Sequence, residues 1–100
     1  MGAKQISIEN GYNLTNYTAN QTATIIKPSP GFLHAVTVNT KGTVASAVSI
    51  FDHASAATNP IGVINSLDLS GTFFYNGNLA NGLVITTTGT AAPNVTVSWR

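Results

Sequence analysis

The chain has 100 residues, enough for one domain built around one hydrophobic core. Its apolar fraction of 43% is ordinary, but only 7% of the residues are charged and the net charge is +1, whereas an average domain has about 25% charged residues. The basic residues are scattered, and no apolar run approaches the roughly 20 residues of a membrane helix. This composition argues against nucleic-acid binding and against a helical membrane protein, and it suits a protein that packs against neighbours.

Export signals and disulfide bonds are both missing from the sequence. There is no cysteine, and the first ten residues, MGAKQISIEN, contain neither an apolar stretch nor a cleavage site of the kind found in signal peptides. We therefore expect a soluble, complete small protein that is made in a reducing compartment without a signal peptide, with both of its ends tied into sheets.

Apolar residues alternate along the chain with a period of two. Turn-forming Gly, Pro, Asn and Asp residues divide this pattern into about eight short segments. They are residues 4–10, 22–27, 32–40, 43–52, 59–67, 71–77, 82–89 and 94–100. Such segments predict an all-β protein, in which residues 1–100 form a single antiparallel β-sandwich of about eight strands. We expect a jelly-roll-like strand order, with an immunoglobulin-like order as the alternative.

The alternation also predicts which side chains face the core. In residues 32–40 it places His34 and Val36 on one face of the strand and Leu33 on the opposite face. In residues 94–100 the expected inward-facing set is Val95, Val97 and Trp99.

The stretch NLTNYTANQT, residues 13–22, contains three Asn-x-Thr triplets, and a fourth spans residues 94–96. Asn-x-Thr is an N-glycosylation acceptor in secreted proteins, but nothing in the sequence directs export. Thr forms strands with a polar face and Asn supports turns, so this composition indicates a solvated or interface-facing surface. We expect residues 1–20 to form an extended arm that becomes ordered only against a neighbouring subunit.

Candidate catalytic or metal-binding side chains are few and poorly spaced. They are Glu9, His34, Asp52, His53 and Asp68. Asp52 and His53 are adjacent, so they would point to opposite faces of a strand and could not form a dyad. There is no His-x-His pair, no cysteine nucleophile and no Gly-x-Ser-x-Gly elbow. We predict that the protein is not an enzyme and has no catalytic, cofactor-binding or metal-binding residues.

Aromatic residues are the main candidates for an interface. Phe73, Phe74 and Tyr75 are consecutive, so a strand there is apolar on both faces, and only one face can belong to the core. Tyr12 and Tyr17 raise the same question within the polar N-terminal stretch. We predict that these five residues contact another subunit or another protein. Aromatic rings beside Asn and Thr also leave carbohydrate binding as an alternative.

Two long stretches resemble a group of small virion proteins of tailed bacteriophages. They are PGFLHAVTVNTKGTVASAVSIFDHASAATNPIGVI and NGLVITTTGTAAPNVTVSWR. The matching elements are Gly31–Asn39, Val48–Asp52, Asn81–Gly89 and Val95–Arg100, so the resemblance covers residues 31–100. These motifs are structural, and they carry over no catalytic residue.

The resemblance implies a jelly-roll β-sandwich that decorates or cements a capsid. We therefore expect a capsid decoration protein, assembled into the virion in the bacterial cytoplasm, that binds the major capsid protein as a homo-oligomer, either a dimer or a trimer. It would require no cofactor, nucleic acid or membrane. The alternative is a carbohydrate-binding module, or a tail or fibre accessory module, on the virion.

Overall fold

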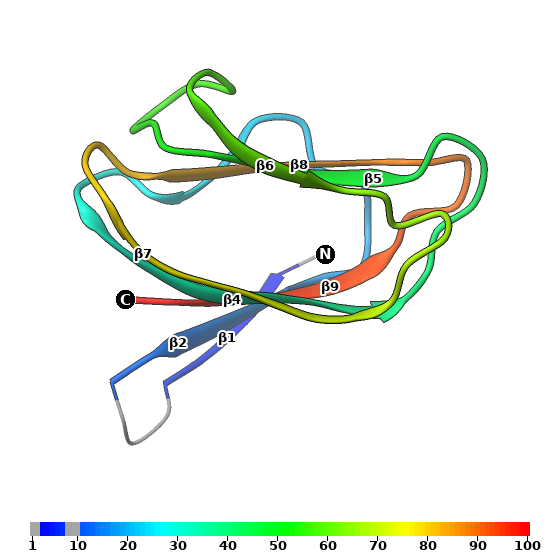
Figure 1. The fold of residues 1–100 in the computed structure, drawn as a ribbon, viewed down its shortest axis with the longest axis horizontal. Coiled ribbons are helices and arrows are strands. Elements are labelled where there is room, and N and C mark those ends of the chain that lie inside the picture. The colour runs from blue at the N-terminus through cyan, green and yellow to red at the C-terminus, as the bar shows by residue number, and fades with distance from the viewer. Residues whose placement is uncertain (1–2, 8–10) are drawn as a thin grey trace.

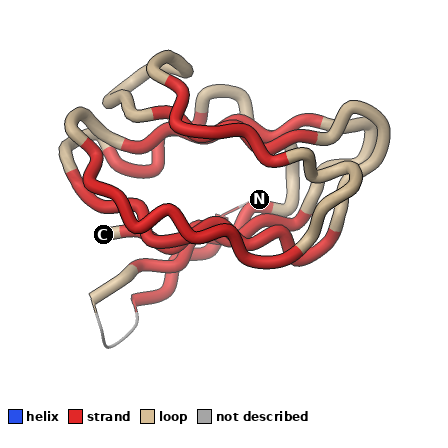
Figure 2. The backbone as a smooth tube through the Cα atoms, in the orientation of Figure 1, coloured by secondary structure: helices blue, strands red, loops and turns tan. Residues whose placement is uncertain are grey.

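The computed structural model describes residues 3–7 and 11–100, and this part of the chain contains nine β-strands and no helix. The strands are β1 (Ala3–Ser7), β2 (Asn13–Tyr17), β3 (Thr24–Lys27), β4 (Gly31–Thr40), β5 (Ala47–Phe51), β6 (Pro60–Ile64), β7 (Gly71–Leu79), β8 (Leu83–Thr88) and β9 (Asn94–Trp99). They form two layers that face each other, joined by loops at both ends (Figures 1 and 2).

Both sheets are antiparallel, and their strand order is that of a jelly roll. One sheet has the order β1-β2-β9-β4-β7 and the other has the order β3-β8-β5-β6. If β2 is counted as the first of eight strands, these orders become 1-8-3-6 and 2-7-4-5. In an immunoglobulin domain the first strand pairs with the second, whereas here β2 pairs with the last strand, β9. The predicted all-β sandwich is therefore confirmed, with the jelly-roll order.

The sequence-based strand list missed β2. This strand lies within the stretch NLTNYTANQT and pairs with β9 along its whole length, from Asn13 opposite Trp99 to Tyr17 opposite Val95. The first predicted segment corresponds instead to β1, which pairs with β2 at the edge of the sheet. Asn is a poor strand former, and it hid the inward-facing alternation of Thr15 and Tyr17. The β2 portion of the expected arm is thus paired within the same chain.

A β-bulge in β4 corrects the predicted faces of that strand. Leu33 and Val36 are both buried, with exposed fractions of 1% and 0%, whereas His34 remains partly exposed. Between Leu33 and Ala35 the strand advances by two residues while its partner β9 advances by one. The extra residue reverses the alternation, so the prediction that Leu33 lies opposite Val36 was wrong.

The core lies between the two sheets and is almost entirely aliphatic. Its buried members are Tyr17, Leu33, Val36, Val38, Val48, Ile50, Ile64, Leu79, Leu83, Ile85, Val95, Val97 and Trp99. Val95, Val97 and Trp99 of β9 are all buried, which confirms their predicted face. Removing these side chains from water is the main favourable contribution to folding.

One hydrogen bond inside the core connects β2 with β9, the first and the last strand of the jelly roll. The indole N–H of Trp99 donates to the hydroxyl oxygen of Thr15 at 2.9 Å, and both residues are buried. A buried Trp N–H or Thr hydroxyl without a hydrogen-bonding partner destabilises the fold, because the polar group has lost its hydrogen bonds to water. This bond therefore stabilises the pairing of β2 with β9.

We predict that Trp99→Phe and Thr15→Val each lower the free energy of unfolding by about 1–3 kcal/mol, because each leaves the other polar group unpaired. Urea denaturation measures the effect, and Thr15→Ser, which keeps the hydroxyl, is the control. The double variant should lose less than the sum of the two single losses. Strict additivity would show that the two side chains are not coupled.

Candidate functional site

The five predicted interface residues differ in how much of each side chain is exposed to solvent. Tyr17 is only 4% exposed and belongs to the core, so it presents almost no surface to another molecule. Phe73 and Tyr75 are partly buried and pack against the core. Phe74 is 65% exposed, and Tyr12 lies partly exposed beside β2. Tyr12 and Phe74 are therefore the members of this set that offer surface.

Tyr12 and Phe74 belong to a group of rings on the outer face of the five-stranded sheet. We call the group the outer row; its members are Tyr12, Phe32, His34 and Phe74. The ring of Tyr12 stacks on His34 with centroids 4.4 Å apart and packs beside Phe32 at 6.1 Å. His34 contacts the edge of Phe74 at 5.5 Å. These contacts connect β7, β4 and the segment that enters β2.

Arg100 borders one end of the outer row. Its guanidinium lies 4.9 Å from the ring centre of Tyr12 and 5.2 Å from that of Phe32. The backbone of the same residue exchanges two hydrogen bonds with Phe32, at 2.7 and 2.9 Å. Cation–π contacts of this kind favour an ordered side chain, so the outer row has a defined positive end.

A Ser–His pair lies on the same face but lacks the groups that catalysis requires. The Nδ1 atom of His34 is 3.1 Å from the hydroxyl oxygen of Ser98. Within the described part of the chain, no carboxylate bonds to His34 to orient it as a base. An activated serine requires such an orienting group and an oxyanion site. The pair is better explained as part of the packing beneath Tyr12.

The same face of the sheet also carries a group of amide and hydroxyl side chains, which we call the amide cluster. Its members are Asn16, Asn39, Asn94 and Thr96. Asn16 Nδ2 donates to Asn94 Oδ1 at 2.7 Å and to Thr96 Oγ1 at 3.1 Å. Asn39 Nδ2 donates to the same two oxygens at 3.2 and 3.0 Å. Three strands thus hold four neutral polar side chains in one fixed arrangement.

Asp52 closes a loop rather than forming a catalytic dyad with His53. Its carboxylate accepts backbone hydrogen bonds from Ala80, Asn81 and Gly82 at 3.1, 2.8 and 3.2 Å. Burial acts to raise the pKa of Asp52, but these backbone donors and the nearby charge of His53 lower it below its ordinary value.

The contacts of Asp52 connect two of the sequence motifs, Val48–Asp52 and Asn81–Gly89. Asp52 follows β5, and its partners lie in the turn before β8, so the carboxylate connects two separate parts of the resemblance. A Cβ atom at Gly82 would lie 2.6 Å from the carbonyl oxygen of Lys27 and 2.7 Å from that of His53. Such contacts are too short for any side chain, so this turn requires glycine.

The remaining predicted titratable candidates are also accounted for by local structure. His53 Nδ1 accepts hydrogen bonds from the backbone of Ser55 and Ala56 within its own loop. Asp68 accepts one from the side chain of Asn65 in the turn after β6. Glu9 lies outside the described residues. In the described ranges, no three His, Cys, Asp or Glu side chains are placed to hold a metal ion.

Sequence analysis missed a second exposed surface, along β6 and the turn that follows it. Its members are Ile61, Val63, Leu67 and Leu69, which are 39%, 65%, 41% and 47% exposed, and we call it the aliphatic edge. β6 pairs only with β5 among the described strands, so its other side is open. Part of the signal was present in the sequence, because Val63 alternates with the buried Ile64 and two leucines follow, whereas Ile61 lies at a register shift in the pairing with β5.

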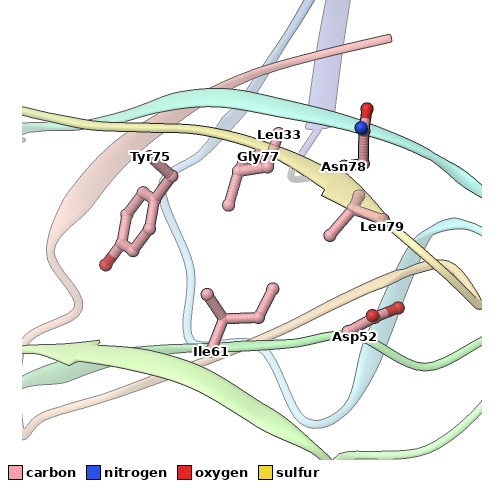
Figure 3. Close-up of a pocket in the computed structure, with 7 residues that line it drawn as sticks. All are labelled: Leu33, Asp52, Ile61, Tyr75, Gly77, Asn78 and Leu79. Atoms are coloured by element: carbon pink, nitrogen blue, oxygen red, sulfur yellow. The ribbon is translucent and has the colours of Figure 1, made fainter.

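A pocket of about 120 Å³ opens at this edge, between the rims of the two sheets. Figure 3 shows Ile61 of β6 facing Tyr75 and Leu79 of β7 across the pocket, with Asp52 at one side. Leu33, Gly77 and Asn78 complete its lining. The pocket is mostly apolar and small, which suits a single aliphatic side chain of another protein rather than a cofactor.

Comparisons with known proteins do not assign a family. No family model, curated protein or solved structure matches this chain. No helix in the described ranges is long and apolar enough to cross a membrane.

We predict that Asp52→Asn lowers stability at neutral pH by about 1 kcal/mol, because an amide is a weaker acceptor for three backbone donors. The lowered pKa means that the carboxylate stabilises the fold above the ordinary Asp pKa of about 3.9. This contribution is lost as the pH falls through the lower folded-state pKa. The difference between wild type and variant should therefore shrink in acid.

Chemical denaturation from pH 7 to pH 2 measures this difference. Asp68→Asn is the control, because that carboxylate accepts its hydrogen bond from a side chain within an exposed turn, and it should change stability by less than about 0.5 kcal/mol. A stability difference for Asp52→Asn that stayed constant down to pH 2 would contradict the assignment.

Proposed function

We propose that this chain is a non-enzymatic structural protein of a bacteriophage virion, a capsid decoration protein that binds and stabilises the shell of the major capsid protein. The observation that carries the proposal is the aliphatic edge with its pocket. The resemblance of residues 31–100 to small phage virion proteins supports a phage particle as the partner.

Exposure at the aliphatic edge is of the kind found in protein interfaces. Four large aliphatic side chains are each at least 39% exposed within nine residues, from Ile61 to Leu69. An exposed group of this kind marks a docking surface in a soluble protein. The neighbouring pocket adds a place where one apolar side chain of the capsid protein anchors, and such buried anchors carry most of the affinity of an interface.

Weak charge is consistent with the same role. With a net charge of +1, the chain has little long-range repulsion to prevent copies from lying close together on a shell. A protein that binds only the assembled shell shifts the equilibrium away from disassembly by mass action. Many copies on one lattice strengthen this effect, even when each contact is weak, provided that neighbouring copies are linked as dimers or trimers.

We predict that purified particles of the virus that encodes this chain contain it in a copy number comparable with that of the major capsid protein. Quantitative mass spectrometry of gradient-purified particles measures the ratio. A ratio of only a few copies per particle would indicate a neck or tail component, and complete absence would reject the virion role.

We predict that Ile61→Asp weakens binding to particles stripped of the protein by about tenfold or more, because it places a charge beside the apolar pocket. Ile25→Asp is the matched control. Ile25 is the same residue type, is similarly exposed at 46%, and lies on β3, at the opposite edge of the same sheet. Equal binding of the two variants would show that the aliphatic edge is not the docking surface.

A further inference from the structure

The outer face of the five-stranded sheet differs chemically from the aliphatic edge and needs its own explanation. We propose that it binds a short neutral oligosaccharide, with one sugar ring against the outer row and the hydroxyl groups of a neighbouring sugar on the amide cluster. This site is separate from the proposed capsid contact, and its argument does not depend on the capsid role.

The amide cluster leaves a mixed set of hydrogen-bonding atoms for a ligand. Both Asn16 and Asn39 use their Nδ2 atoms to donate to Asn94 and Thr96. Among the described residues, the Oδ1 atoms of Asn16 and Asn39 and the Nδ2 atom of Asn94 have no hydrogen-bonding partner. The free set thus contains both acceptors and a donor. A sugar hydroxyl, which donates and accepts at once, matches this set better than an ion does.

The register of the strands places the two groups on the same face, within the span of a short oligosaccharide. Thr96 of β9 lies opposite Asn16 on one side and opposite Thr37 on the other. Thr37 lies opposite Thr72 of β7, and their hydroxyls are hydrogen-bonded at 2.9 Å. Phe74 follows two residues later on β7, which is about 7 Å along the strand. A short oligosaccharide can therefore contact the ring and the amides together.

The four side chains of the amide cluster are all neutral, which favours a neutral ligand at this point of the face. The amide cluster contains only amides and a hydroxyl, and Arg100 lies at the far end of the outer row, over Tyr12 and Phe32. The four side chains of the cluster include no carboxylate for a cation and no cationic group for an anion, and Lys4 of β1 is paired opposite Asn16 beside them. An apolar protein partner would leave the amide atoms unpaired, and burying them in that state is costly.

The face is also organised before any ligand arrives. Hydrogen bonds between side chains of β2, β4 and β9 fix the amide cluster, and stacking on Tyr12 and Phe74 fixes His34. Side chains that are already ordered lose less conformational entropy on binding. The paired strands β2, β4, β7 and β9 also hold these positions in place, although β4 is bulged at His34 and its register shifts at Asn39.

A glycan array carrying neutral and acidic oligosaccharides, followed by calorimetry on the best ligand, tests the proposal. We expect binding to neutral glycans, and we expect Asn39→Ala and Phe74→Ala each to weaken it by about tenfold or more. Asn20→Ala is the control for the amide, because Asn20 is an exposed Asn with one backbone hydrogen bond in the loop after β2. Val63→Ala is the control for the ring, because Val63 is also 65% exposed.

The other occupants of this face give different results. Absence of glycan binding by the wild-type protein would overturn the proposal, as would binding restricted to acidic glycans and lost in Arg100→Ala. Self-association that disappears in Phe74→Ala, measured by analytical ultracentrifugation, would assign the face to a second copy instead. Ile61→Asp should keep full glycan binding, so failure of the capsid role and failure of the saccharide site remain distinguishable. Circular dichroism melts verify that each variant is folded.

Discussion

The pairing of β2 with β9 is the constraint on which the rest of the structure depends. It joins residues 13–17 to residues 95–99, almost the full length of the chain apart. Without this pairing the five-stranded sheet would lose both of the strands at its N-terminal edge. Thr15 would lose its bond to Trp99, and the core would lose the cover that Tyr17 provides. Closing such a long loop has a large entropic cost, which the buried core must offset.

The same pairing assembles the outer face. Asn16 meets Asn94 and Thr96 because β2 lies beside β9 in that register. Tyr12 reaches His34 for the same reason, and His34 in turn hydrogen-bonds Ser98 of β9. A slip of one residue would turn Asn16 into the core and Thr15 toward solvent. The surface chemistry and the stability of the fold therefore depend on one register.

The molecule thus offers two surfaces of opposite character. The aliphatic edge is open, apolar and built from four residues within nine positions on β6 and its turn, whereas the outer face combines rings and amides from four strands. Few charges lie on either surface. A protein of this composition depends on shape and on neutral hydrogen bonds for recognition, and salt should have little influence on its contacts. The proposed attachment to a shell and the proposed binding of a saccharide use different sides of the sandwich.

The sequence alone determined what local alternation can determine: the class of the fold, the inward faces of β9 and the two-faced character of β7. Tertiary structure alone decided the identity of β2, whose Asn residues look like turn formers until β9 supplies the pairing. It also decided the bulge that turns Leu33 inward and His34 outward, and the burial of Tyr17. The physical reason is the distance along the chain over which each feature is set. The alternation of side chains depends only on neighbouring residues, whereas register, bulges and clusters such as Asn16 with Asn94 form only when strands far apart in the sequence pair.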